Sequence, residues 1–268
     1  MKKIAIRLLK IAIIVYLLVG IGLYFFQEKL LFHPTVLAQD YVFNLKDSFT
    51  EQTIRYDSST SYHLIKFHTA TACKGVVLYF HGNRGNIIRY QRFVKNFTKN
   101  GYEVWMMDYP GFGKSTGLLN EQMLYEEALQ LYKMAKAIYQ PGQIIIYGKS
   151  LGTGIAAQLA SRRDCRRLIL ETPYYDIVSA ASNYAWMYPL SWMVKYNIPT
   201  HLYLQKVTAP VTIFHGTSDE VISYSSASKL KAVLKKGDEF ITLDGGNHRN
   251  LNSFPLMQQK LDSLLSLK

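Results

Sequence analysis

The sequence predicts an α/β fold in which a mostly parallel, eight-stranded sheet is flanked by helices. Short apolar runs alternate with amphipathic helical segments through most of the 268 residues, and this rhythm is typical of parallel sheets covered on both faces. Basic residues followed by an uncharged apolar stretch predict an N-terminal transmembrane anchor. An aromatic-rich interruption of the rhythm predicts a small cap.

We expect residues 1–26 to form the anchor and residues 27–268 to form one domain. The uncharged run over 11–26 rises about 24 Å as a helix, short of a hydrocarbon core of about 30 Å, and adding Leu8 and Leu9 nearly spans it. Basic residues before the run favour a cytoplasmic N-terminus: Lys2, Lys3, Arg7 and Lys10. The domain would then lie on the non-cytoplasmic side, periplasmic or extracellular. A cleaved signal peptide ending at Gly22 is the alternative.

Composition limits the classes of ligand. The net charge is +12, but no nucleic-acid motif or dense basic run accompanies it, so we expect no nucleic-acid partner. The basic surface is either simply solvated or attracted to anionic lipid headgroups. Cys73 and Cys165 are too few for a metal site or a disulfide scaffold, and whether they pair stays open. No metal or cofactor is expected, and the oligomeric state stays open.

The elements follow one another in a regular order. An opening strand pair lies at 51–57 and 62–69, and later strands are expected at 75–82, 102–109, 143–150, 166–172, 211–219 and 239–248. Helices are expected at 86–99, 120–139, behind residue 150 and at 254–266. The helix over 120–139 has Asn120 as a candidate N-cap and an apolar face that ends at Ile138.

The rhythm breaks between residues 173 and 203, which contain eight aromatic side chains. We interpret this segment as a partly helical cap over the carboxyl edge of the sheet. Within it Tyr174, Trp186 and Trp192 are the candidate substrate-binding residues. Alternatively, these aromatic side chains pack the cap onto the domain core.

Residues 148–152 carry the chemistry. Gly-Lys-Ser here matches the end of a phosphate-binding loop, but that loop needs a glycine at the position of Gln143. The same residues match G-x-S-x-G between an apolar strand and a helix of small residues, the context of a nucleophile elbow. We therefore predict that Ser150 is a nucleophile.

A serine nucleophile needs a base, and the base needs an acid that orients it. In this fold the expected order along the chain is serine, acid, histidine. Asp219 and His248 each follow a predicted strand, so both can converge on Ser150 at the carboxyl ends of the strands. Asp176 is the alternative acid.

Acyl transfer also needs hydrogen-bond donors for the oxyanion that develops. One candidate is the backbone N–H of Leu151, directly after the nucleophile. The other is the backbone N–H of Asn83 in the glycine-flanked loop after residues 75–80, with Arg84 as the second choice. His81 is expected to be buried and to brace this loop.

Five motifs together resemble the α/β-hydrolase fold of serine hydrolases, in its order and at similar spacing: LYFHGNRGN, DYPGFGKSTG, IIIYGKSLGTG, HGTSDEVI and GGNHRNL. The chain resembles most closely the membrane-anchored branch that includes the Bem46-like proteins and the alpha/beta hydrolase domain-containing proteins 13 and 17. The resemblance implies Ser150 as nucleophile, Asp219 as acid and His248 as base. Arg84 departs from the small residue usual there, and Ser115 is implied to be structural.

These observations predict a serine hydrolase that cleaves an ester or thioester, with an acyl-chain or lipid-like substrate and the membrane as the partner of the N-terminal helix. The alternatives are a serine peptidase on the same residues and a non-catalytic binding protein with this fold. The sequence does not decide among ester, thioester and peptide bonds, and fold alone does not name a substrate.

Overall fold

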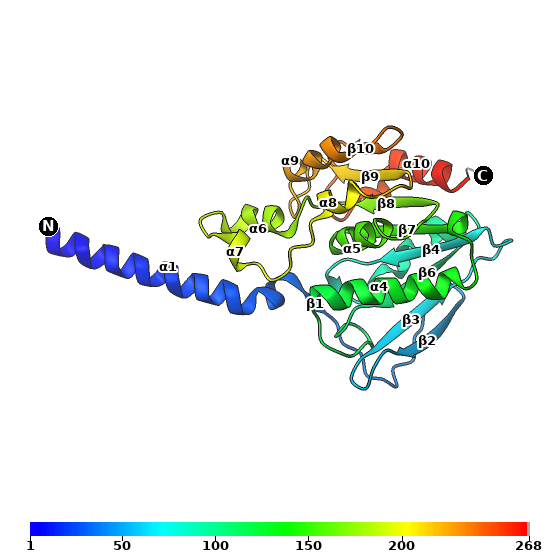
Figure 1. The fold of residues 1–268 in the computed structure, drawn as a ribbon, viewed down its shortest axis with the longest axis horizontal. Helices are drawn as coiled ribbons and strands as arrows, with labels where there is room; N and C mark the ends of the chain where they lie inside the picture. The colour runs from blue at the N-terminus through cyan, green and yellow to red at the C-terminus, as the bar shows by residue number, and fades with distance from the viewer. Residues whose placement is uncertain (267–268) are drawn as a thin grey trace.

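The computed structural model describes residues 1–266, and within them eight strands form one twisted sheet (Figure 1). The order is β10-β9-β8-β7-β4-β6-β3-β2. Neighbours from β10 to β6 are parallel, whereas β3 pairs antiparallel with both β6 and β2. The strands are β2 (Phe49–Arg55), β3 (Ser61–Phe67), β4 (Gly75–Phe80), β6 (Tyr102–Asp108), β7 (Ile144–Lys149), β8 (Arg167–Glu171), β9 (Val211–Gly216) and β10 (Glu239–Leu243). The predicted fold class is confirmed.

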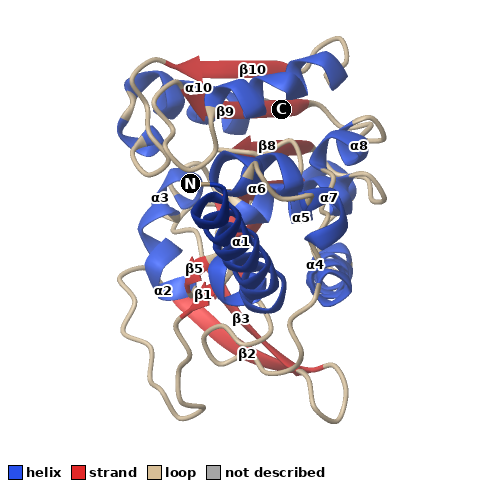
Figure 2. Cartoon of the chain, turned by 90° about the vertical axis from the view of Figure 1, so that its left-hand side faces the viewer, coloured by secondary structure: helices blue, strands red, loops and turns tan. Residues whose placement is uncertain are grey.

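Helix α1 (Lys2–Leu31) projects from the domain, and in Figure 2 it points at the viewer with α2 and α3 on one side and α6 and α7 on the other. It is long and apolar enough to cross a membrane. The helix continues to Leu31, beyond the expected end of the anchor at residue 26, because the sequence after that residue carries no helix breaker. Its second half lies along the 173–203 segment, where Tyr16 stacks on Tyr188 with ring centroids 4.5 Å apart.

Short helices cover both faces of the sheet: α2 (Ile87–Tyr90), α3 (Lys95–Thr98), α4 (Glu121–Lys136), α5 (Leu151–Ala160), α6 (Ile177–Ala185), α7 (Leu190–Met193), α8 (Thr200–Leu204), α9 (Tyr224–Ala227) and α10 (Pro255–Ser266). Short 3-10 helices lie at η1 (Gln91–Phe93), η2 (Pro141–Gln143), η3 (Ser228–Val233) and η4 (Leu251–Ser253). The helix expected over 86–99 is thus divided into α2, η1 and α3. Three of the helices, α6 to α8, fall in or at the end of the predicted cap segment.

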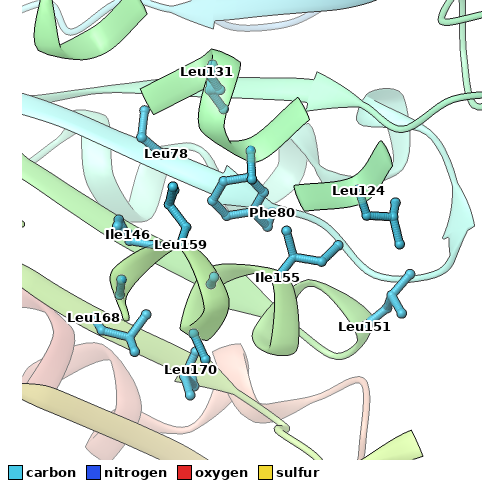
Figure 3. Close-up of a cluster of buried hydrophobic side chains, with 14 of the residues drawn as sticks. Leu78, Phe80, Leu124, Leu131, Ile146, Leu151, Ile155, Leu159, Leu168 and Leu170 are labelled. Carbon is cyan, nitrogen blue, oxygen red and sulfur yellow. The ribbon is translucent and has the colours of Figure 1, made fainter. Parts of the chain in front are cut away.

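Two apolar clusters pack on opposite faces of the sheet because successive strand residues point to opposite sides. In β4, Leu78 joins the cluster under α4 and α5, while Val77 joins the cluster under α2, α3 and α10. Figure 3 shows the first cluster, with side chains of α4 and α5 interleaved with those of the strands. These two clusters hold the sheet rigid where its carboxyl edge carries the polar residues.

Helix α4 begins as expected, since the Asn120 side chain accepts a hydrogen bond from the backbone N–H of Met123 at 2.9 Å. Its end differs from the expectation. The helix stops at Lys136, and Ile138, expected on the apolar face, is 64% exposed. The residues after the helix turn toward the 3-10 turn at Pro141 before they could continue that face.

A two-residue bridge, β1 (His33–Pro34) with β5 (Arg84–Gly85), ties the chain after α1 to the loop after β4. The His33 N–H donates to the Asn83 carbonyl at 2.9 Å, and the Thr35 N–H donates to the Gly85 carbonyl at 2.9 Å. The end of α1 is therefore fixed against the loop that was predicted to hold an oxyanion donor.

Candidate active site

Ser150 occupies a strained turn between β7 and α5. Its φ is 52° and its ψ is −120°, a region that non-glycine residues enter at a cost. A Cβ at Gly148 would lie 2.5 Å from the Gly152 carbonyl oxygen, and one at Gly152 would lie 2.1 Å from the Phe80 carbonyl oxygen. Both glycines are thus required by close backbone approach, and the turn lifts the serine hydroxyl out of the sheet.

The structure brings Ser150, His248 and Asp219 together in one hydrogen-bonded chain. His248 Nε2 lies 2.9 Å from Ser150 Oγ, and His248 Nδ1 lies 2.8 Å from Asp219 Oδ2. Asp219 follows β9 and His248 follows β10, so both come from carboxyl ends of neighbouring strands, as expected. The N–H groups of Val221 and Ile222 donate to Asp219 Oδ1 at 2.9 and 2.8 Å and fix that carboxylate.

Asp219 is held in its ionised form. Burial opposes ionisation, but the hydrogen bond from His248 and its charge outweigh burial and lower the pKa of Asp219 below its ordinary value. The carboxylate therefore remains an acceptor for the imidazole N–H through the neutral range. His215 lies in β9 close to this carboxylate, but burial lowers the pKa of its ring, and its Nε2 lies 3.0 Å from the Ile222 carbonyl.

The alternative acid lies elsewhere. Asp176 caps α6, where its carboxylate accepts from the Ser179 N–H at 2.6 Å. Its Oδ2 lies 3.9 Å from the Nδ1 of His201 rather than against His248. The structure thus leaves Asp219 as the carboxylate beside His248.

Asn83 and Leu151, the residues expected to supply the oxyanion donors, both line the cavity that Ser150 lines. In the described part of the chain, the N–H groups of Asn83 and Leu151 donate to no protein acceptor. The pKa of Tyr90 is raised by burial, against opposing effects of Arg89 and of the backbone N–H groups of Arg84 and Gly82. The Arg84 N–H therefore faces the Tyr90 hydroxyl, which favours Asn83 over Arg84 as the second donor.

The loop that carries Asn83 is held in place by the buried His81 side chain and by a contact with the end of α1. His81 is fully buried, with Nδ1 2.7 Å from the Gly82 carbonyl and Nε2 3.2 Å from Asp108 Oδ1, so its expected structural role is consistent with its place. The Asn83 side chain donates to the Leu31 carbonyl at 2.5 Å. Ser115 also lies away from the site, where its hydroxyl donates to the Asp108 carbonyl.

A buried ionic cluster beside the nucleophile was missed at the sequence level. Lys149 is paired with Glu171, which also accepts from Tyr147 and, at 2.8 Å, from the Asn252 amide. The Glu171 carbonyl accepts the Ser150 N–H at 2.9 Å. This network holds the residue before the nucleophile, and its only signal in the sequence is an opposite charge pair on adjacent strands, Lys149 opposite Glu171.

A cavity of about 650 Å³ opens above Ser150, within the range of small-molecule sites. Tyr174 lines it as expected, and its hydroxyl donates to the Leu151 carbonyl at 3.1 Å. Trp186 and Trp192, which were also expected there, do not line it and are 76% and 87% exposed. Smaller cap residues take their place: Ile177, Ala180, Ala181, Leu190, Met193 and Val194.

Helix α1 also forms part of the cavity wall through Leu23, Gln27, Leu30 and Leu31. Leu23 lies within the predicted anchor and the other three directly follow it, and the sequence pattern does not predict their contact with the cavity. The signal was weak, because an apolar helix that meets lipid and one that lines an apolar cavity have the same composition.

A sheet of this topology, with a serine on a strained strand-turn-helix and helices on both faces, defines an α/β hydrolase. The model of the family described as Serine aminopeptidase, S33, matches residues 71–204. The chain belongs to that family and, within it, to the branch of alpha/beta hydrolase domain-containing proteins.

Among relatives, Alpha/beta hydrolase domain-containing protein 17C of Xenopus tropicalis is 28% identical over 196 residues, 71% of this chain and 61% of that protein. Lysophosphatidylserine lipase ABHD12 of Danio rerio is 33% identical over 181 residues, 58% of this chain and 46% of that protein. The chain thus spans less than two thirds of the length of these relatives.

Solved structures share the fold. The Pyrococcus furiosus esterase Pf2001 superimposes with a TM-score of 0.68 at 17% identity, covering 87% of this chain and 98% of that one. A soluble variant of monoglyceride lipase from Saccharomyces cerevisiae gives a TM-score of 0.61 at 18% identity, covering 84% and 98%.

Proposed function

We propose that this protein is a serine hydrolase that cleaves an ester or thioester of an acyl chain through a Ser150 acyl-enzyme. The observation that carries the proposal is the hydrogen-bonded chain from Ser150 through His248 to Asp219 at the floor of a largely apolar cavity. An acyl chain would lie against the side chains of the cap and α1, including Tyr174.

In this mechanism His248 Nε2 takes the Ser150 hydroxyl proton as the oxygen attacks the acyl carbonyl carbon. The N–H groups of Asn83 and Leu151 stabilise the oxyanion, a contribution worth roughly 10²- to 10³-fold in rate per donor. Collapse breaks the bond to the alcohol or thiol, which leaves with the proton from His248. Water, deprotonated by His248, then releases the acid and restores the serine.

We also propose that α1 anchors the protein in a membrane, with residues 1–26 as the anchor and the hydrolase domain on the non-cytoplasmic side. The apolar helix and the basic residues at its start support this orientation. The helix end packs on the domain, so the anchor and the cavity belong to one unit.

A serine peptidase on the same residues is the second candidate, because the matching family is described as a serine aminopeptidase. The cavity favours the ester reading, since its apolar lining accommodates an acyl chain and its described lining residues include no carboxylate to bind a peptide amino terminus. The relatives and neighbours named lipase or esterase point the same way.

The test is labelling with a fluorophosphonate, followed by turnover of p-nitrophenyl esters of increasing chain length and of aminoacyl amides. We expect Ser150→Ala to lose labelling and about 10⁴-fold or more of ester turnover, and efficiency to rise from acetate to at least butyrate because each buried methylene contributes about 0.8 kcal/mol. Ser228→Ala, at the start of η3 and outside the cavity lining, is the matched control. Faster cleavage of amides than of any ester would instead favour the peptidase.

A further inference from the structure

The cavity has one strongly cationic side. Four arginines line it, from the loop after β4, from α2 and η1, and from the loop after β10: Arg84, Arg89, Arg92 and Arg249. No aspartate or glutamate is among its described lining residues. Such an excess of one sign in a hollow lined by low-dielectric walls attracts a ligand group of opposite charge.

These four guanidinium groups are available to a ligand. In residues 1–266 none of them forms an ion pair with a carboxylate, and all four residues are exposed. Arg92 only lies over the ring of Phe93, 4.8 Å from its centroid. Lys149 lines the same cavity but is neutralised by Glu171, so the free positive charge belongs to the arginines.

The arginines and the apolar residues come from different elements of the cavity wall. Arg84 directly follows Asn83, and Arg249 directly follows His248, so two of the four flank the groups around the Ser150 hydroxyl. The apolar lining comes from α1, α6 and α7, and Figure 2 shows α2 and α6–α7 on either side of α1. With its carbonyl at Ser150 and its chain among the apolar residues, an ester would direct its alcohol portion toward the arginines.

We propose that the site takes acyl esters whose alcohol portion carries a phosphate group, which the arginines bind. A guanidinium group binds phosphate oxygens through paired, charge-assisted hydrogen bonds. An uncharged alcohol portion would not need four such cationic groups, whereas a phosphate group would use several of them. This inference rests on the proposed function and names the substrate class of the same site. It also gives Arg84, the departure from the usual small residue, a role in specificity.

The test compares substrates of one short chain that stay monomeric: hexanoyl glycerol phosphate and hexanoyl glycerol. We expect kcat/KM to favour the phosphate ester by about tenfold or more, chiefly through KM, and the preference to shrink between about 0.1 and 1 M salt as the screening length falls from about 10 to 3 Å. Arg89→Gln, Arg92→Gln and Arg249→Gln should each reduce the preference about two- to fivefold, the range of an exposed ion pair.

The matched control is Arg55→Gln, an exposed arginine on edge strand β2 outside the cavity lining, which should leave the preference unchanged. A second arm separates the substrate phosphate from the phosphates of a bilayer. Oleoyl glycerol is offered in phosphatidylcholine vesicles with and without phosphatidylglycerol. The proposal is wrong if hexanoyl glycerol phosphate and hexanoyl glycerol are hydrolysed equally and only phosphatidylglycerol in the vesicles raises the rate of hydrolysis. The arginines would then bind the bilayer.

Binding to the Ser150→Ala protein keeps this inference separate from the hydrolase proposal. Calorimetry should give tighter binding of hexanoyl glycerol phosphate than of hexanoyl glycerol, and the arginine variants should reduce that difference. Selective binding without turnover by the wild-type protein would overturn the hydrolase and retain the phosphate site. Turnover of both esters with equal binding would overturn the phosphate site and retain the hydrolase.

Discussion

At the scale of single residues, Ser150 combines its place beside His248 with a backbone conformation that disfavours any side chain. With φ at 52° and ψ at −120°, a Cβ is strained, and the hydrogen bonds of the surrounding turn maintain this geometry. The strain arises from the backbone conformation and the Cβ atom, and it does not depend on the hydroxyl group. Stability and reactivity at this residue are therefore separable by substitution.

We predict that Ser150→Gly is more stable than both the wild type and Ser150→Ala. Relief of the strain should raise the free energy of unfolding by about 1–3 kcal/mol. The greater backbone entropy of glycine in the unfolded chain should lower it by about 0.5–1 kcal/mol. Alanine keeps the Cβ and should unfold close to the wild-type temperature. Thermal unfolding of the three proteins measures this, and a glycine variant that melts below the alanine variant would contradict the strain argument.

Glu127 on α4 is a second residue with a measurable consequence. It is fully buried, and its carboxylate oxygens have no hydrogen-bond partner within the described residues. Burial, and next the charge of Asp108, raise the pKa of Glu127 well above its ordinary value of 4.5. The protonated form is therefore the one that the folded state prefers.

The sign of the pH effect follows from that direction. A group whose pKa is higher in the folded state stabilises fully below its unfolded pKa, and this stability is lost as the pH rises toward the folded pKa. We predict that the wild type loses stability from about pH 4.5 upward relative to Glu127→Gln, which does not titrate. Denaturant unfolding of both proteins from pH 4.5 to 8 measures the gap, and parallel pH profiles would contradict it.

At the scale of elements, the end of α1 and the loop after β4 act together. The Leu31 carbonyl accepts from the Asn83 side chain, and β1 pairs with β5 directly beyond. The backbone N–H of Asn83 is the proposed oxyanion donor, so its direction depends on how α1 ends. This coupling makes the end of α1 part of the candidate site.

We predict that Asn83→Ala lowers kcat about tenfold with little change in KM. The backbone N–H remains but loses its fixed direction, so the loss should be smaller than the roughly 10²- to 10³-fold expected for removal of a donor. Asn100→Ala, which removes a side-chain hydrogen bond to Asp262 far from the cavity, is the control. Unchanged kcat in Asn83→Ala would show that the α1 contact does not position the donor.

Short sequence patterns predicted those elements whose conformation depends on neighbouring residues in the sequence. The strand, turn and helix around Ser150 were predicted because glycines at 148 and 152 and an apolar run before them fit few other structures. The positions of Asp219 and His248 followed from strand ends in a parallel sheet. The Lys149–Glu171 pair and the contacts of α1 were missed because they arise between elements distant in sequence, where no short pattern records them.

In the cap, the sequence predicted an apolar segment but not which of its side chains line the cavity. Aromatic residues in 173–203 predicted an apolar cavity wall, but size alone does not tell which face a side chain takes. Tyr174 is 2% exposed and lines the cavity, whereas Trp186 and Trp192 are exposed and do not line it. The smaller alanine and leucine residues of α6 and α7 leave the room that tryptophan would fill.

At the scale of the whole molecule, the exposed tryptophans and α1 belong to one surface. The ring of Tyr16 stacks on Tyr188, and the Tyr188 hydroxyl donates to the Tyr16 carbonyl at 3.1 Å, between Trp186 and Trp192 in sequence. Tyr16 lies within the apolar stretch that the proposed anchor places in the bilayer. In the orientation that we propose, this contact places the cap tip, with Trp186 and Trp192, within the lipid layer rather than in water.

We predict that vesicles containing brominated phosphatidylcholine quench the fluorescence of Trp186 and Trp192 in the membrane-bound protein. The chain has three tryptophans, and the third, Trp105, is 1% exposed in the domain core, so it serves as an internal reference that stays unquenched. Trp186→Phe combined with Trp192→Phe should remove most of the quenchable emission and leave that of Trp105. Unquenched emission in the wild type, with the protein still sedimenting with vesicles, would mean that α1 holds the membrane while the cap remains in water.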